Sequence, residues 1–408
     1  MAALGLSYMG TKLALAPDIA EIISAAKSGP VLDGFAGMCA VGQVVARKRQ
    51  VWSNDVQIFA ATVARLLFVY PDHPPRCSAV AALTYDEFQY NREILRRRFH
   101  ATLEREQAAI ESRSTTRLLT SGRECRKLLT LHSPELSALR RAPRSSPYRL
   151  FSLYYSGSYF SLAQCIDIDS IVFALNRAAA LRRLSRGQRA WLVVTLARIL
   201  QKISTTTGHF AQYLEPKPET LSRFVRQRSR SVWEEWISAI PLDGPVGDWD
   251  WRASNRVFRD DTLRLLGRLA KYDERPGVIY ADPPYTEDHY SRYYHLLETL
   301  IKYDYPVVEG KARYRTDRFH TPFSIKTKAT AAFETLAKRT ANLKADLVLS
   351  YPTTGVLSEI GTTPYQIIRH HFRSVDVCRR ISHDHSTLGA SKGPASHAVT
   401  ETIYWARP

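Results

Sequence analysis

The sequence of 408 residues predicts an α/β protein whose open, mostly parallel sheet is interrupted by a long, mainly helical insertion. Three observations support this fold class. A strand, a turn, a helix and a second strand follow one another near the start, Arg-rich helical sequence fills residues 71–252, and strand-like apolar runs resume at residue 256. We therefore expect one domain from residues 1–70 and 253–408, and an inserted basic domain from residues 71–252.

The first expected element is a β-α-β unit. Residues 31–35 (VLDGF) form a short apolar strand that leads into a turn of small residues, and a helix should continue to about Arg49 before a second strand at residues 51–55. Small residues in such a turn let the backbone approach a ligand. A carboxylate at the end of the second strand, here Asp55, can hold two ribose hydroxyls, so this layout is typical of a nucleotide-binding half-sheet.

The insertion is expected to bind nucleic acid. The chain carries a formal net charge of +18, which implies a polyanionic partner. Residues 91–150 contain 14 Lys and Arg against 6 Asp and Glu, and they include the cluster Arg96, Arg97 and Arg98. Solvated helix faces can also be basic, but this local excess favours contacts with phosphates.

After the insertion, apolar runs predict the rest of the sheet. Strands are expected at residues 256–259, 277–281 and 346–350, and residues 374–378 and 399–405 could form a closing antiparallel pair. Residues 304–328 are rich in Arg, Tyr and Pro and lack periodicity, so we expect a long surface loop there.

Several classes of protein are disfavoured by composition. The five cysteines are scattered and none has the spacing of a metal clip, which predicts a reducing cytosol and no metal site. No apolar run approaches the roughly 18 residues of a membrane span, so no membrane partner is expected. The sequence therefore predicts a cytoplasmic protein.

The most informative motif follows the apolar run at residues 277–281. There Asp282, Pro283, Pro284 and Tyr285 come directly after a buried strand, where open α/β sheets assemble their active sites. The prolines stiffen the turn and leave carbonyls free as acceptors, beside the Asp282 carboxylate. Two acceptors can grip both hydrogens of a nucleobase amine and stabilise positive charge that develops on its nitrogen, while Tyr285 could stack on the base. An ordinary Pro-rich turn is the alternative.

Four motifs together resemble one family. They are residues 8–12 (YMGTK), the loop Phe35, Ala36 and Gly37, the pair Asn54 and Asp55, and the tetrapeptide Asp282 to Tyr285, and they occur in the order found in the Dam-like (D12 class, alpha group) N6-adenine DNA methyltransferases. The resemblance implies a Rossmann-like sheet that binds S-adenosyl-L-methionine, with a target-recognition domain inserted before the catalytic tetrapeptide.

The resemblance also implies residue roles. Asp282 and the Pro283 carbonyl would hold the amine of an adenine flipped out of double-stranded DNA, with Pro284 and Tyr285 completing the catalytic turn. Asp261 resembles the acid that contacts the cofactor's adenine, with Asp260 as the competing choice and a helix N-cap as an equal alternative. The expected cofactor-binding residues are Tyr8, Lys12, Asp33, Phe35, Ala36, Gly37, Asp55, Asp261 and Asp282.

Further nucleic-acid contacts are expected just beyond the catalytic turn. The aromatic rings of Tyr290 and Tyr293 could wall an extruded base, with Arg292 beside them, although Tyr293 could instead pack inward from an amphipathic helix. The recognised DNA sequence cannot be read from these residues.

One departure from the family pattern leaves alternatives open. The family commonly has a second glycine two positions after Gly37, where this chain has Cys39, which questions how closely the backbone approaches the cofactor. The alternatives are the same chemistry on RNA adenine or cytosine N4, or an inactive DNA-recognition subunit that keeps the fold. A cognate restriction nuclease or defence-system subunits are possible protein partners.

Overall fold

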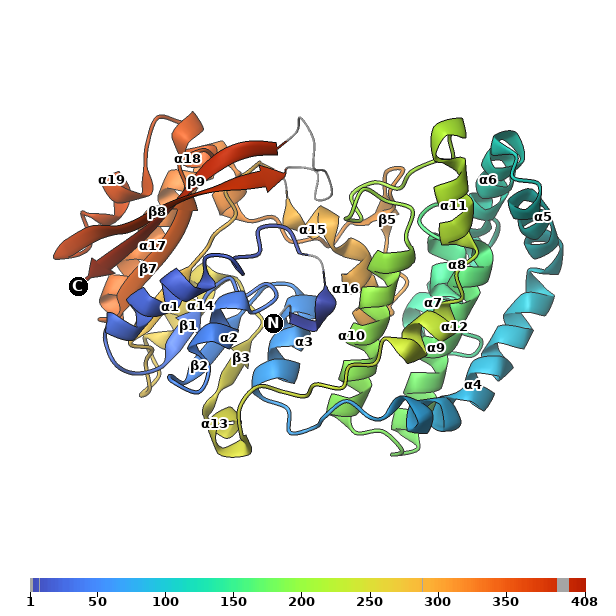
Figure 1. Ribbon diagram of the computed structural model, residues 1–408, viewed down its shortest axis with the longest axis horizontal. Coiled ribbons are helices and arrows are strands. Elements are labelled where there is room, and N and C mark those ends of the chain that lie inside the picture. The colour runs from blue at the N-terminus through green and yellow to red at the C-terminus, as the bar shows by residue number, and fades with distance from the viewer. Residues whose placement is uncertain (1–2, 7, 288, 387–395) are drawn as a thin grey trace. The chain divides into compact units, whose positions relative to one another are not determined.

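The computed structural model describes residues 3–6, 8–287, 289–386 and 396–408 (Figure 1). The chain divides into two compact units. The sheet unit contains Met1–Pro71, Pro245–Ser291 and Phe319–Pro408, and the helical unit contains Asp72–Gly244 and Arg292–Arg318. The expected borders were residues 70/71 and 252/253, and the expected insertion did not include residues 292–318.

A seven-stranded sheet with the order β3-β2-β1-β4-β7-β9-β8 forms the sheet unit. Its strands are β1 (Val31–Asp33), β2 (Val51–Asn54), β3 (Arg256–Phe258), β4 (Val278–Ala281), β7 (Asp346–Pro352), β8 (Ser374–Ser386) and β9 (Ser396–Arg407). The pairs β1–β2, β1–β4, β2–β3 and β4–β7 are parallel, whereas β9 is antiparallel to both β7 and β8. The predicted α/β fold class and its closing antiparallel pair are confirmed.

The helices of the sheet unit range from short turns to the 17-residue α17, and most of them lie between its strands along the chain. They are η1 (Ala3–Gly5), α1 (Ala16–Ala25), α2 (Ala40–Val45), α3 (Ile58–Phe68), α13 (Trp249–Ser254), α14 (Thr262–Leu269), η3 (Pro322–Ser324), α17 (Lys326–Asn342), α18 (Val356–Glu359) and α19 (Pro364–Ile368), with α15 (Tyr290–Tyr293) at the border of the units. The helix after the first strand ends at Val45 rather than near Arg49. Arg47 has φ 65, a left-handed conformation through which a right-handed helix cannot continue.

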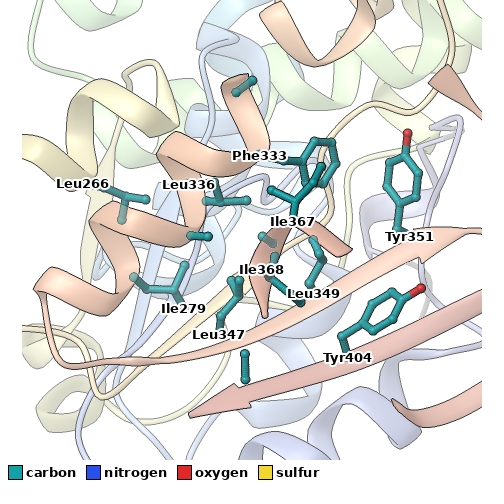
Figure 2. Close-up of a cluster of buried hydrophobic side chains, with 14 of the residues drawn as sticks. Leu266, Ile279, Phe333, Leu336, Leu347, Leu349, Tyr351, Ile367, Ile368 and Tyr404 are labelled. Atoms are coloured by element: carbon teal, nitrogen blue, oxygen red, sulfur yellow. The ribbon is translucent and has the colours of Figure 1, made fainter. Parts of the chain in front are cut away.

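An apolar core holds helices against the sheet. Figure 2 shows Phe333 and Leu336 from α17 and Leu266 from α14 close to Ile279 of β4 and Leu347 of β7. All five side chains are buried, and apolar burial is the main favourable term in folding. The strands whose carboxyl ends carry the predicted acids are therefore anchored by a close-packed layer.

Helices make up most of the regular structure in the helical unit. It contains α4 (Cys77–Arg98), α5 (His100–Glu111), α6 (Thr115–Leu131), α7 (Ser133–Arg141), α8 (Leu150–Tyr154), α9 (Leu162–Ala180), α10 (Arg186–Ile203), η2 (Pro218–Thr220), α11 (Leu221–Arg228), α12 (Val232–Ser238) and α16 (His295–Lys302), with a two-stranded ribbon of β5 (Val308–Glu309) and β6 (Tyr314–Arg315). Ser161 and Ser185 start α9 and α10 with capping boxes, which satisfy backbone donors at the helix starts.

A buried carboxylate explains why residues 292–318 group with the helical unit. Asp169 of α9 is fully buried and accepts hydrogen bonds from the Tyr303 hydroxyl at 2.6 Å and from the Phe151 and Ser152 backbone amides at 2.8 Å each. Burial raises the pKa of Asp169 to about 6 although these donors oppose the shift. A buried carboxylate without partners is costly, so Tyr303 is tied to α9 by a contact that local sequence does not reveal.

The surface loop expected at residues 304–328 is found only in part, because most of the segment is irregular but it also contains a short ribbon and a buried arginine. Val308 and Glu309 pair with Arg315 and Tyr314 in the ribbon, and α17 begins at Lys326. The Arg315 side chain is only 3% exposed, with ion pairs to Asp304 at 2.6 Å and to Asp317 at 2.8 Å. The polar composition suggested solvent, but paired charges can be buried.

Among the helices that the structure describes, none is both long and apolar enough to span a membrane.

Candidate functional site

A pocket lies at the carboxyl ends of the parallel strands of the sheet unit, where β1 ends in Asp33, β2 is followed by Asp55 and β4 by Asp282. It contains about 1060 Å³ of space outside protein atoms, part of it open solvent. All the residues that the sequence predicted for the catalytic turn and the cofactor line it: Tyr8, Lys12, Asp33, Phe35, Ala36, Gly37, Asp55, Asp261, Asp282, Pro283, Pro284 and Tyr285. The parallel register of β1, β2 and β4 brings these distant segments together.

The turn after β1 has the backbone that a glycine-rich loop requires. Gly37 has φ 48, and its amide donates to Asp55 Oδ2 at 3.0 Å. A Cβ at position 37 would lie 3.0 Å from a ring carbon of Tyr8, so glycine permits this close approach. Cys39, at the position where the family pattern has glycine, is left-handed as well, with φ 63, and is fully buried. The chain therefore keeps the glycine-like conformation at a cost of roughly 1–2 kcal/mol for a residue with a Cβ.

Two acids of the pocket are held by backbone amides. Asp55 accepts from Gly37 and, through Oδ1, from the Gln57 amide at 2.8 Å, while Asp33 accepts from the Phe35 amide at 3.2 Å. Burial raises the pKa of Asp55 to about 6 and that of Asp33 to about 8, although the amide donors oppose both shifts. Near pH 7, Asp55 is thus mainly a carboxylate, whereas Asp33 is mainly protonated.

The predicted catalytic acid is paired with a lysine. Lys12 Nζ lies 2.9 Å from Asp282 Oδ1, and the two side chains are 8% and 15% exposed. Burial raises the pKa of Asp282 above its ordinary value, and the Lys12 charge opposes this shift. Burial would lower the pKa of Lys12, but the carboxylates of Asp282 and Glu401 outweigh it and raise this pKa. The ammonium also lies 5.7 Å from the centre of the Tyr285 ring.

The turn after β7 supports the catalytic turn. The Val356 amide donates to the Tyr285 carbonyl at 2.9 Å, and the centres of the Tyr285 and Tyr351 rings lie 6.4 Å apart in a T-shaped arrangement. Gly355 has φ 150, and a Cβ there would lie 2.7 Å from the Tyr285 carbonyl oxygen. Tyr285 itself is 7% exposed. Residues after β7 therefore fix the turn after β4, and the sequence analysis did not identify Gly355.

The choice between Asp260 and Asp261 is clearer in the structure. Asp261 lines the pocket, and it also caps α14 by accepting from the Arg264 amide at 2.9 Å. Asp260 is 8% exposed and instead forms ion pairs with Arg264 and Arg268 at 2.7 Å each. The N-cap and the pocket wall are therefore compatible functions of Asp261.

The predicted nucleic-acid residues are divided between the two units. Tyr290 lines it, whereas Arg292 and Tyr293 belong to the helical unit. Tyr293 is buried at 7% exposure, with its ring 4.5 Å from that of His209. Arg96, Arg97 and Arg98 form the exposed end of α4, and Arg98 pairs with Glu135 at 2.6 Å. Tyr293 therefore packs inward, which was the alternative considered for it from the sequence.

Sequence reasoning missed several polar side chains of the site. Glu401 of β9 lies 3.6 Å from Lys12 Nζ, although its only signal in the sequence is an acid within an apolar strand. Gln57 Oε1 and Ser291 Oγ are buried at the pocket, and neither has a hydrogen-bond partner among the described residues. Those two atoms could bond a polar ligand. No group of three or more potential metal ligands occurs within the described ranges.

Comparison with known proteins identifies relatives of the segments that build the pocket. Residues 8–120 and 268–348 match the family described as D12 class N6 adenine-specific DNA methyltransferase, which confirms the resemblance identified from the sequence. The chain is 25% identical over 181 residues to modification methylase LlaI of Lactococcus lactis subsp. lactis, over 44% of this chain and 26% of that protein. It is 26% identical over 202 residues to type II methyltransferase M.FokI of Planomicrobium okeanokoites, over 49% and 28%.

A third relative matches more of the chain. Modification methylase StsI of Streptococcus sanguinis is 20% identical over 367 residues, which is 87% of this chain and 45% of that protein. The matched part of this chain therefore covers 26–45% of the length of these relatives.

Proposed function

Because the chain resembles the D12 class N6 adenine-specific DNA methyltransferases in the segments that line its pocket, we propose that it transfers a methyl group from S-adenosyl-L-methionine to adenine N6 in double-stranded DNA. The observation that carries this proposal is the position of Asp282 and Pro283 at the end of β4, in the same pocket as Gly37 and Asp55. Acceptors for an amine and a nucleotide-binding loop thus share one cavity.

The residues present fit the cofactor. The Asp55 carboxylate suits two ribose hydroxyls, and Gly37 lets the backbone come close to a ligand. The buried Gln57 Oε1 is an acceptor at the wall of the pocket and has no donor among the described residues. Asp261 lines the pocket and would accept from the adenine amine of the cofactor. When bound, S-adenosyl-L-methionine supplies a methyl group on a positively charged sulfonium.

The catalytic turn would act on the amine of the target base. That nitrogen is a poor nucleophile because its lone pair is delocalised into the ring. The Asp282 carboxylate and the Pro283 carbonyl would accept its two hydrogens, which directs the lone pair toward the methyl group and stabilises positive charge on nitrogen. Lys12 would hold Asp282 in place through Oδ1, and the buried Tyr285 would contribute one wall of the base pocket.

The helical unit would bind the DNA backbone. The target adenine must leave the duplex, and its unstacking costs a few kcal/mol that other contacts must offset. A groove in this unit is lined by Arg144, Arg177, Arg186 and Arg189, with the aromatic residues Tyr90, Tyr148 and Phe173. Glu87 is the one acid in this lining, and it pairs with Arg177 at 3.6 Å. The excess of arginine supports phosphate binding here, in addition to the predicted Arg96, Arg97 and Arg98.

The names of the relatives support a role in DNA modification, since LlaI and StsI are named modification methylases. Pairing of this chain with a cognate restriction nuclease, or with defence-system subunits, stays a prediction. No membrane partner is proposed, and a cytoplasmic location also stays a prediction.

The decisive experiment expresses the chain in a bacterial host without DNA methylation and maps modified bases across the genome. The proposal expects N6-methyladenine at a defined sequence. Methylation of cytosine N4, or of RNA alone in an assay with purified protein, would overturn the choice of substrate. Absence of transfer to any nucleic acid, together with no cofactor binding by calorimetry, would identify an inactive recognition subunit.

The catalytic assignment has its own test. Asp282→Ala is expected to lower kcat at least a thousandfold, because an acceptor for the amine and its negative charge are lost together. Binding of DNA and cofactor should change by less than about fivefold, since their other contacts remain. Asp282→Asn is the matched control that keeps the shape without the charge. Near-normal turnover of either variant would contradict the assignment.

A further inference from the structure

A second carboxylate shares the lysine of the catalytic turn. Glu401 lies in β9, opposite Pro352 at the last position of the pairing with β7, and it is 2% exposed. Its Oε1 is 3.6 Å from Lys12 Nζ and accepts a hydrogen bond from the fully buried Ser350 hydroxyl at 2.7 Å. Lys12 thus contacts one carboxylate on the pocket side and a second, more deeply buried one behind it.

The balance of charge in this cluster favours positive charge at the substrate. Lys12 with Asp282 alone would form a neutral pair, and much of the negative charge that faces the amine would be cancelled. Two carboxylates and one ammonium leave a net charge of −1. A fixed negative charge at the place where positive charge develops lowers the barrier, and it acts strongly because the three side chains of the cluster are largely buried.

The geometry also leaves one catalytic oxygen available. Lys12 contacts Oδ1 of Asp282, so Oδ2 is the oxygen left to accept from a substrate amine. The second contact holds the ammonium to Glu401, a carboxylate that is not among the residues lining the pocket. A buried lysine with only one counterion would have no such restraint.

We propose that Glu401 is a positioning residue for methyl transfer, which holds Lys12 between two carboxylates so that the cluster keeps a net negative charge and Asp282 keeps a free oxygen for the amine. This inference rests on the proposed function. Glu401 touches neither the substrate nor the cofactor in this account, and it acts through Lys12. Ser350 keeps the Glu401 carboxylate in position.

The electrostatic surroundings of Asp282 predict the direction of a pH effect. The titratable groups that act on Asp282 or respond to its charge are Lys12, Asp33, Tyr280, Tyr285 and Glu401. Burial raises the pKa of Tyr280 and Tyr285, so both phenols stay neutral at moderate pH. Glu401 raises the pKa of Asp282 by repulsion between like charges. Removal of the Glu401 charge should therefore lower the pKa of Asp282.

The test compares wild type with Glu401→Gln, which removes the charge but keeps the shape. We expect kcat to fall roughly tenfold at pH 8, because less charge stabilises the amine in the transition state. The acidic limb of the kcat profile should move to lower pH, with the Kd of the cofactor within about twofold by calorimetry. Glu401→Asp should restore part of kcat. Thr400→Val, on the opposite face of the same strand, is the control and should behave as wild type.

If Glu401→Gln loses kcat but the acidic limb of its pH profile does not shift, the role of Glu401 is structural only and the proposal is overturned. Wild-type kinetics in this variant would overturn it as well. Carboxyl ¹³C NMR of aspartate-labelled protein gives a readout without turnover, with Asp282→Asn to assign the signal. A titration of Asp282 that moves to lower pH in Glu401→Gln supports the shared lysine, and an unmoved one overturns it. Failure of the wild type to methylate DNA would instead contradict the proposed function, and the NMR result would still decide the charge coupling.

Discussion

Three carboxyl groups meet at the pocket, and burial raises the pKa of each: Asp33 to about 8, and Asp55 and Asp282 to about 6. The sequence pattern pointed to Asp55 and Asp282, because an acid at the end of a strand-like run is a local pattern, whereas Asp33 was expected only from the family resemblance. Glu401 was not visible in this way. Its contact with Lys12 joins residues far apart in the chain and depends on how β9 pairs with β7, which no local pattern encodes.

The pKa of Asp282 predicts the pH dependence of turnover. Protonation of Asp282 removes the negative charge that stabilises the amine of the substrate. We therefore expect kcat to fall about tenfold per pH unit below roughly pH 6. Steady-state kinetics with saturating DNA and cofactor between pH 5 and 9 would measure this. Asp55 titrates in the same range, but its protonation should weaken cofactor binding and leave kcat unchanged. An acid limb confined to the cofactor KM would therefore contradict the role of Asp282.

Asp33 predicts an effect of pH on stability. Its pKa is raised above the ordinary value of 3.8, so the folded state keeps a proton that the unfolded state has released between about pH 4 and 8. The free energy of unfolding should therefore decrease as the pH rises through this range. Asp33→Asn cannot ionise, and its Tm should exceed that of wild type by about 3 °C or more at pH 8 while matching it more closely at pH 5. Calorimetry at both pH values measures this, and an equal difference at both would contradict the prediction.

The catalytic turn depends on a second element for its shape. Its prolines stiffen it locally, but its last carbonyl is held by the Val356 amide at the start of α18. The strands themselves were predictable because their apolar runs are continuous, as expected for parallel strands with both faces covered. The ordered part of residues 304–328 was not predictable, because a segment with Arg315, Asp304 and Asp317 looks like exposed polar sequence. Only the structure shows that Arg315 is buried and paired with both acids.

Gly355→Ala tests this dependence between elements. The new Cβ would meet the Tyr285 carbonyl oxygen at 2.7 Å, and φ 150 is a conformation that alanine rarely adopts. We expect the turn to shift, with kcat at least about tenfold lower and the protein less stable by roughly 2 kcal/mol or more. Gly361→Ala is the control, since Gly361 has φ 75 but nothing within 4 Å of an added Cβ. Gly361→Ala should be less stable than wild type but keep its kcat. Equal losses of kcat in Gly355→Ala and Gly361→Ala would contradict the steric account.

At the scale of the whole molecule, charge and chemistry are placed in different units. The carboxyl-lined pocket belongs to the sheet unit, and the arginine-lined groove belongs to the helical unit. The sequence predicted this division of labour from the Arg-rich composition of the insertion. It did not predict which arginines converge, because Arg144 and Arg189 come from segments that only helix packing brings together.

The groove predicts electrostatic binding of DNA. Arg144→Ala and Arg189→Ala should each weaken DNA binding, most strongly at low salt, and each should reduce the slope of log Kd against log salt by about 1. Fluorescence anisotropy over a range of salt concentrations measures both quantities. Lys338→Ala, on the exposed surface of α17, removes one charge from the sheet unit and serves as the control. An unchanged slope in both groove variants would contradict phosphate contacts there.

The order of strands in the sheet has a consequence for synthesis of the protein on the ribosome. β9 is the last strand in sequence, yet it lies between β7 and β8. Glu401 comes from this strand, so the cluster around Lys12 stays incomplete until β9 has been translated, whereas the helical unit is complete at Arg318. At about 5–20 residues per second, the helical unit has several seconds to fold before the sheet closes. A nascent chain would therefore complete its helical unit before the cluster around Lys12, and pulse proteolysis of stalled chains would detect that interval.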